Sequence, residues 1–457
     1  MKQLLAYCLS IILCVSFTGC MENYLDLYPE DKITSASFPE NESDIKLLLN
    51  GVYAQLREKE VYNQGLFGFG ITDGATPNAF NWGTDEVFNK LGAGRLSSSD
   101  GGVVTYRWKR CYEIISRANY LLACMDLVDL SEEAKAKYSG ETHFLRGLAY
   151  SVLAETYGGV PIILTNISTE EARSLKRASL EETWQQALDD YEVAITNLGV
   201  DAPEPGRATK GAALGMKMRA YLYQGKYKEV LSCVEQIDAL KKYGLFHSYE
   251  GLFDPANENN KEVLFDIQYI EGENSQGSYI DQYCGTGTGS WTRGSRYVPT
   301  DDLVAAYETI DGSPVDPENP YENRDPRLGF TAVLPGSYFL GYRFPNYLYP
   351  GGAFNHAGNR LKHLSTRKYR IQDESKLPPS GQSYINDIIL RYADVLLSKA
   401  EAIIETNGNV ADAIAILNRI RTERDDVKIS LLPTSMSREE AREKVRHETV
   451  SYTHLTL

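Results

Sequence analysis

One cysteine near the start of the chain, Cys20, carries the clearest chemistry in the sequence. It follows an apolar run over residues 4–17 and stands directly after the small pair Thr18 and Gly19. This layout is typical of a bacterial lipoprotein signal peptide, in which cleavage before the cysteine leaves a diacylated N-terminus. Each buried acyl methylene contributes about 0.8 kcal/mol to membrane attachment. We therefore expect residues 1–19 to be removed and Cys20 to carry a lipid anchor.

Two other interpretations of the leader stay open. One is a plain secretory leader in which the cysteine is incidental. The other is a transmembrane helix, which is disfavoured because the apolar run is shorter than the roughly 20 residues that span a bilayer. No later stretch of the sequence is apolar enough to span a membrane.

The other cysteines and the histidines lack the spacing of a metal or disulfide site. No HExxH motif, no Cys-x-x-Cys motif and no histidine pair at helical spacing is present, so neither a metal site nor a cofactor is predicted. Three of the four cysteines after Cys20 fall on apolar faces of predicted helices, and we expect buried thiols rather than disulfides. The four are Cys111, Cys124, Cys233 and Cys284.

The charge of the chain excludes some classes of partner. The formal net charge is -15 and becomes -16 when Lys2 leaves with the leader, and no basic cluster interrupts it. Nucleic acid and anionic lipid headgroups are therefore not expected to bind. Removal of 19 residues from 457 leaves 438, enough for one large domain or two ordinary ones.

Apolar residues recur at intervals of three and four in two separated regions, which predicts a mainly helical protein. Gly158, Gly159 and Pro161 end one of these helices, and Gly225 forms a one-residue turn between two others. Helix, glycine, helix in antiparallel order is typical of tetratricopeptide-like pairs, although an irregular bundle also fits. In the first region the helices are predicted over residues 108–122, 145–157, 184–198, 212–223 and 227–240.

The second helical region begins near Ser383. A broad apolar stripe predicts one helix over residues 383–404, residues 407–409 break it, and residues 413–420 form its partner. Between residues 246 and 382, glycine, proline, asparagine and tyrosine are dense, and only a few short strands are expected.

Within this loop-rich region, residues 262–269 alternate as a strand could. Residues 63–105 share its composition. Long loops on a rigid helical scaffold commonly form a binding surface.

Several segments, in this order along the chain, resemble the SusD/RagB family of outer-membrane lipoproteins from Bacteroidetes. The strongest match runs over residues 141–161, and another near-diagnostic stretch covers 391–402. The resemblance implies a leader at 1–19, a tether at 20–40 and a single SusD-like domain at 41–448. The remaining matching segments are Cys20 with residues 24–29 and Phe38, and residues 117–122, 206–210, 221–227, 311–312, 323–328 and 418–421.

The resemblance also implies how the domain is divided and what it does. A helical scaffold over residues 41–245 and 383–448 would carry a loop-rich ligand region over 246–382. Members of the family bind glycans, or sometimes peptides, at the cell surface. They form a lid on a SusC-like TonB-dependent transporter and are not enzymes. A purely protein-binding helical-repeat scaffold is a less favoured alternative.

Candidate ligand residues lie in the two loop-rich regions. Sugars present hydroxyls and flat C–H faces, so their sites combine aromatic platforms with polar side chains. Trp82 and Trp291 could instead only pack their loops, and no motif carries over an individual residue from the family. The candidates are Trp82, Tyr283, Trp291 and Tyr297 as platforms, and Asp73, Asn81 and Arg293 as polar partners.

The charged residues of the family motifs are interpreted as parts of the scaffold. Arg146, Arg391, Asp394 and Glu401 lie beside apolar stripes, so we expect paired or capping charges. Residues 323–326 are predicted to form a turn with local side-chain hydrogen bonds. A glycosidase would need two carboxylates in a cleft, and the 62 acidic residues of the chain are numerous enough to supply such a pair. No nucleophile or phosphate-binding motif accompanies them, and no catalytic residue is predicted.

The last residues, 449–457, are predicted to be a non-native tail. The family resemblance stops near Glu448, whereas related chains continue through further helices. Residues 450–457 fit no helical pattern and resemble translated sequencing-adapter DNA. We therefore expect a truncated gene with an artificial end, which resequencing of the source locus would test.

Overall fold

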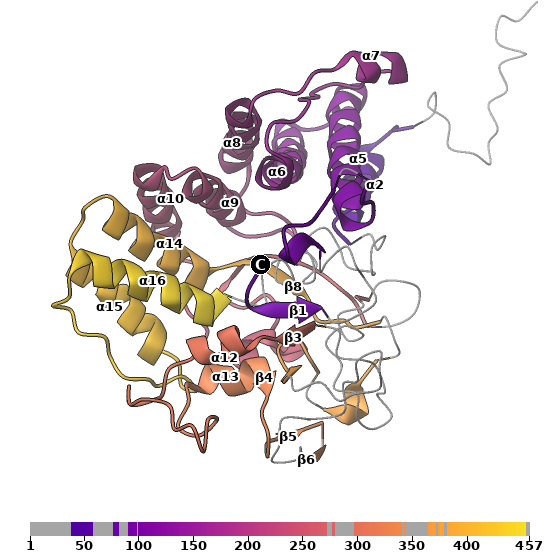
Figure 1. Cartoon of the computed structure of the whole chain (residues 1–457). Helices are drawn as coiled ribbons and strands as arrows, with labels where there is room; N and C mark the ends of the chain where they lie inside the picture. Colours follow the sequence, from indigo (N-terminus) through magenta and orange to yellow (C-terminus); the bar gives the residue numbers. More distant parts are fainter. Residues whose placement is uncertain are drawn as a thin grey trace, which may run out of the picture.

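A computed structural model describes the chain over most of the predicted domain. The leader, Cys20, Cys284 and most of the tether lie outside the described residues. Figure 1 shows a mainly helical molecule with short strands gathered on one side. The described residues are 38–57, 76–81, 90–97, 99–271, 277–278, 297–340, 342–343, 364–371, 373–378 and 382–453.

The longer helices follow one another as antiparallel pairs, as predicted. Helix α5 packs against α6, α6 against α8, α8 against α9 and α9 against α10, and α10 then packs against α14, which contacts both α15 and α16 (Figure 1). These helices are α2 (Glu42–Ala54), α5 (Val103–Cys124), α6 (Glu132–Tyr157), α7 (Thr169–Ser174), α8 (Leu180–Asn197), α9 (Lys210–Tyr223), α10 (Tyr227–Ala239), α14 (Tyr392–Glu405), α15 (Val410–Thr422) and α16 (Arg438–Thr453).

Local sequence signals set the helix ends. At the start of α8, the Ser179 hydroxyl accepts a hydrogen bond from the Glu182 amide, and the Glu182 carboxylate accepts one from the Ser179 amide. This capping box satisfies donors that a helix start leaves free. Helix α6 ends at Gly158, whose φ of 74° is the left-handed conformation that glycine adopts without strain. The predicted stop after residue 157 is therefore confirmed.

The strands form small two-stranded sheets beside the helices. In the described part of the chain, β1 pairs with β3, β2 with β8, β4 with β7 and β5 with β6, all antiparallel. The strands are β1 (Ala79–Asn81), β2 (Val263–Ile267), β3 (Tyr297–Pro299), β4 (Ala332–Val333), β5 (Tyr338–Phe339), β6 (Tyr342–Arg343), β7 (Ser365–Thr366) and β8 (Asp387–Arg391). Two short helices, α12 (Asp301–Ala306) and α13 (Pro326–Thr331), lie between β3 and β4. Four short 3-10 turns complete the described elements: Met125–Leu127, Gly251–Phe253, Pro255–Asn257 and Glu374–Lys376.

The prediction of one helix over residues 383–404 is wrong for its first part. Residues Asp387–Arg391 form strand β8, and helix α14 begins only at Tyr392. The four residues after Asp387 are buried because β8 pairs with β2 and also contacts α9. A short apolar run buried on both faces has no period that separates strand from helix. The strand predicted at 262–269 is confirmed as β2.

The expectation that residues 450–457 belong to no helix is wrong for the first four. Helix α16 continues through Thr453. Val450 is partly buried and packs against the main core, so the helix gains apolar contact there. Extension of an existing helix also adds one backbone hydrogen bond per residue. The proposed origin of residues 449–457 stays a prediction.

Most of the motif charges serve the scaffold, as expected. Arg146 on α6 is buried and forms an ion pair with Asp190 on α8, with Nη2 2.7 Å from Oδ1. The Asp394 carboxylate accepts a hydrogen bond from the Arg391 amide at 3.0 Å and caps α14. Glu401 is half-buried on α14 but forms no ion pair within the described residues, so for Glu401 the prediction of a partner is wrong.

The thiols and the turn at residues 323–326 also match the expectations. Cys111, Cys124 and Cys233 are buried and unpaired. Burial raises the pKa of Cys111 to about 12, which keeps that thiol protonated and unreactive. In the turn, the Asp325 carboxylate accepts a hydrogen bond from the Arg327 amide at 3.0 Å and starts α13.

Candidate ligand-binding site

Two predicted ligand residues, Asn81 and Tyr297, meet across the sheet formed by β1 and β3. The two strands pair antiparallel, with Ala79 opposite Pro299 and the backbone of Asn81 opposite that of Tyr297. This pairing joins two segments more than two hundred positions apart in the sequence. The two loop-rich regions of the sequence therefore meet in this sheet.

Thr300 fastens this sheet to the next helix. Its amide donates to the carbonyl of Asn78 at 3.0 Å, and its hydroxyl donates to the carbonyl of Pro77. The same hydroxyl accepts a hydrogen bond from the Leu303 amide at 3.2 Å, which caps α12. The backbone and side chain of this one residue thus join the segment before β1 to the end of β3 and the start of α12.

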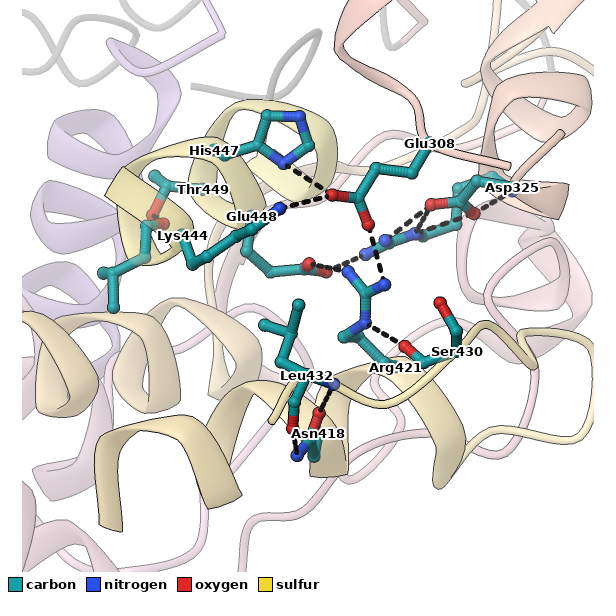
Figure 2. Close-up of polar contacts among 12 residues, drawn as sticks. Glu308, Asp325, Asn418, Arg421, Ser430, Leu432, Lys444, His447, Glu448 and Thr449 are labelled. Atoms are coloured by element: carbon teal, nitrogen blue, oxygen red, sulfur yellow. Dashed lines mark hydrogen bonds and ion pairs between the residues drawn. The ribbon is translucent and has the colours of Figure 1, made fainter. Parts of the chain in front are cut away.

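Helix α12 is in turn fixed to the C-terminal helices by a polar cluster, which Figure 2 shows. Glu308 follows α12 and accepts hydrogen bonds from Lys444 of α16 at 2.8 Å and from Arg421 of α15 at 2.7 Å. Burial alone would raise the pKa of Glu308, but these two cations lower it to about 2. The carboxylate therefore stays ionised over the physiological pH range.

Glu448 of α16 lies at the centre of this cluster (Figure 2). Its two oxygens accept hydrogen bonds from Arg327 of α13 at 2.5 Å and from Arg421 at 3.0 Å. Arg327 also pairs with Asp325 at 2.6 Å. All four side chains are at most 2% exposed. Since a buried charge is tolerated only when it is paired and hydrogen-bonded, these contacts fix α13 against the scaffold.

The structure brings together two of the seven predicted ligand residues, Asn81 and Tyr297, by their backbones. Trp82 directly follows Asn81 in the sequence. The other predicted ligand residues lie outside the described residues: Asp73, Trp82, Tyr283, Trp291 and Arg293.

Sequence reasoning missed the residues that position this site. Thr300 stands directly before Asp301 and Asp302, and a threonine followed by acidic residues is a helix-start signature that could have been recognised. The roles of Arg421 and Glu448 could not have been recognised in this way, since their partners lie far away in sequence.

Among the described residues, no group of three or more histidine, cysteine, aspartate or glutamate side chains could hold a metal ion. No described helix has the length and apolarity needed to cross a membrane.

Two family models match this chain, and together they cover most of it. Residues 23–222 match the model described as "Starch-binding associating with outer membrane", and residues 261–449 match the model described as "SusD family". The chain belongs to the SusD family. The mainly helical SusD-like fold predicted from the sequence is thus confirmed.

Individual members of the SusD family support the same assignment. The SusD-like protein P25 of Formosa agariphila is 26% identical over 92% of this chain and 81% of its own length. A SusD-like protein of Bacteroides ovatus is 24% identical over 89% of this chain and 73% of its own.

Solved structures of SusD-like proteins share the fold. A SusD-like carbohydrate binding protein from Bacteroides fragilis superposes with a TM-score of 0.79 at 25% identity, covering 91% of this chain and 84% of that one. The surface glycan-binding protein A of Bacteroides uniformis has a TM-score of 0.71 at 18% identity, covering 90% of this chain and 86% of its own. At that identity the second likeness shows the fold alone.

Proposed function

We propose that this protein captures oligosaccharides at the outer membrane and delivers them to a SusC-like TonB-dependent transporter. The pairing of β1 with β3 carries the proposal, because it puts the backbones of Asn81 and Tyr297 opposite each other. Membership of the SusD family and the description of its N-terminal model as starch-binding support a glycan ligand. The proposed role is binding without catalysis, and no catalytic residue or cofactor is assigned.

Attachment through a lipid on Cys20, facing the cell exterior, completes the proposal. A tethered binding protein raises the local concentration of ligand at the transporter entrance, because binding and delivery then occur within the reach of the tether. Peptide cargo is the second candidate, since side-chain amides and aromatic rings suit both ligands. A scaffold that binds only proteins is the third.

A glycan array on the lipid-free protein from residue 21, followed by isothermal titration with each bound oligosaccharide, tests the proposal. The variants Asn81→Ala, Tyr297→Ala, Trp82→Ala and Trp291→Ala should each weaken binding at least tenfold. Tyr338→Ala is the matched control, because Tyr338 on β5 is 68% exposed and is not a predicted ligand residue. Binding of peptides alone, unchanged affinity in all four variants, or hydrolysis of the glycan would contradict the proposal.

A further inference from the structure

A hollow with a mixed polar and apolar lining lies on the scaffold between the end of α2, residues 201–209 and strand β2. It has two adjoining chambers of about 490 and 380 Å³. Both volumes fall within the range of about 300–1,000 Å³ that small-molecule sites occupy. Residues 204–207 and Asp266 line both chambers, and the described lining of the two chambers contains no residue of β1 or β3. The hollow is therefore distinct from the site at Asn81 and Tyr297.

Arg207 fixes the shared wall of the two chambers. Its guanidinium donates to Asn50 of α2 at 2.5 Å and to Glu204 at 3.2 Å, and it lies over the Tyr53 ring with 4.9 Å to the centroid. A second ion-pair partner, the buried Glu141, lies 3.5 Å away. Because Arg207 is held from several sides, the wall is formed before any ligand arrives, which lowers the entropic cost of binding.

The loop that carries Arg207 presses closely on the end of β2. Gly206 has a φ of 77°, and a Cβ added there would lie 2.3 Å from Cγ of Gln268. Only glycine fits both the backbone angle and the close approach. The Gln268 side chain donates to Asp266 at 2.7 Å and to Asn259 at 3.1 Å. These contacts leave a rim of oriented amide groups between the two chambers.

The charges of the hollow are largely matched inside it. Lys242 forms an ion pair with Asp201 at 3.0 Å, and Arg207 pairs with Glu204. Asp266, which is 4% exposed, accepts hydrogen bonds from amide side chains, and burial raises its pKa to about 6. Such a wall gives no strong field for an ionic ligand, so it favours a neutral one.

We propose that this hollow is a second carbohydrate subsite. A side-chain amide both donates and accepts, as a sugar hydroxyl does, and Asn50, Asn259 and Gln268 line the chambers. The Tyr53 and Tyr243 rings supply apolar surface beside them. The inference rests on the proposed function, and it adds a second point of contact for an oligosaccharide.

The test is titration of the lipid-free protein with maltoheptaose, cellohexaose, xylohexaose and mannohexaose, one at a time. Ala202→Trp fills the first chamber and Ala54→Trp the second, because both alanines line the hollow. Gln268→Ala removes an amide without adding volume. Ala172→Trp, on an exposed face of α7, is the matched control. Circular dichroism checks that each variant is folded.

For a glycan that binds, we expect two binding events in the original protein and in Ala172→Trp. Filling either chamber should abolish one event, and Gln268→Ala should weaken it at least tenfold. A single event that Asn81→Ala and Tyr297→Ala abolish, but that the chamber variants leave intact, overturns the second subsite and leaves the proposed function standing. Binding abolished only by the chamber variants supports the hollow and refutes the β1–β3 location. Failure of all four glycans overturns the subsite, and the glycan array then decides the proposed function separately.

Discussion

Replacement of Glu448 by alanine should destabilise the protein by about 3 kcal/mol. Its carboxylate is 2% exposed and is shared by two buried guanidiniums, of Arg327 at 2.5 Å and of Arg421 at 3.0 Å. Loss of one partner of a buried ion pair costs about 3–5 kcal/mol, because the other charge stays buried. The lower end applies here because each arginine keeps a second carboxylate, Asp325 and Glu308 respectively.

The assay is urea unfolding followed by far-ultraviolet circular dichroism, with the free energy extrapolated to water. Glu439→Ala is the control on the same helix. Its carboxylate is 78% exposed and pairs only with Arg442 in the described part of the chain. An exposed pair of this kind contributes about 0–1 kcal/mol. The free energy of unfolding should fall less in Glu448→Gln than in Glu448→Ala, because the amide oxygen still accepts a hydrogen bond from one arginine.

The same variant should also weaken glycan binding, because Glu448 holds α13 and, through Arg421 and Glu308, the end of α12. A Glu448→Ala loss as small as that of Glu439→Ala would refute the reasoning. It would mean that the charges of the cluster in Figure 2 are solvated rather than buried. Unchanged glycan affinity with the full loss of stability would refute only the link from the cluster to the site.

Three further predictions concern stability and reactivity. Burial raises the pKa of Asp387 to about 7, above an unfolded value of about 3.9. The protonated carboxyl therefore contributes its full stabilisation of the folded state below about pH 4, and this stabilisation is lost as the pH rises through 7. Asp387→Asn should therefore flatten the fall in unfolding free energy between pH 5 and pH 8, measured in urea, and an equal slope in both proteins would contradict this. Thr300→Val removes the cap of α12, so it should lower the free energy of unfolding by about 1 kcal/mol and reduce glycan affinity. The control Thr196→Val, on an exposed turn of α8, should leave glycan affinity unchanged. Equal glycan affinities of the two variants would refute the positioning role of Thr300. Iodoacetamide should leave the buried thiols of Cys111, Cys124 and Cys233 unmodified in the native protein and should modify them in urea, as measured by mass spectrometry. Labelling of any of the three in the native protein would show that this thiol is accessible and would contradict the prediction.

Helices were predictable where their signals are local. A capping box such as that of Ser179 and Glu182, or a stop such as Gly158, is complete within a few residues. Family motifs placed the scaffold for the same reason, since they mark helices and the turns between them. The candidate site was predictable only as two loop-rich regions with aromatic and polar residues.

Strand β8 shows where local reasoning fails. Its residues continue an apolar stripe that helix α14 completes, and only pairing with β2 makes Asp387–Arg391 extended. The partner strand lies more than one hundred residues earlier in the chain. No local pattern contains that information, because the hydrogen bonds that decide between strand and helix come from the distant segment.

The amino-acid sequence alone determined a helical scaffold, because helix caps, glycine stops and apolar spacing act over a few residues, and its resemblance to family motifs indicated that the scaffold is SusD-like. Only the tertiary structure decided that Asn81 faces Tyr297, and that Glu448 joins two arginines from α13 and α15. Those contacts connect distant parts of the chain. Their energy comes from burial and pairing, which exist only after the helices have packed.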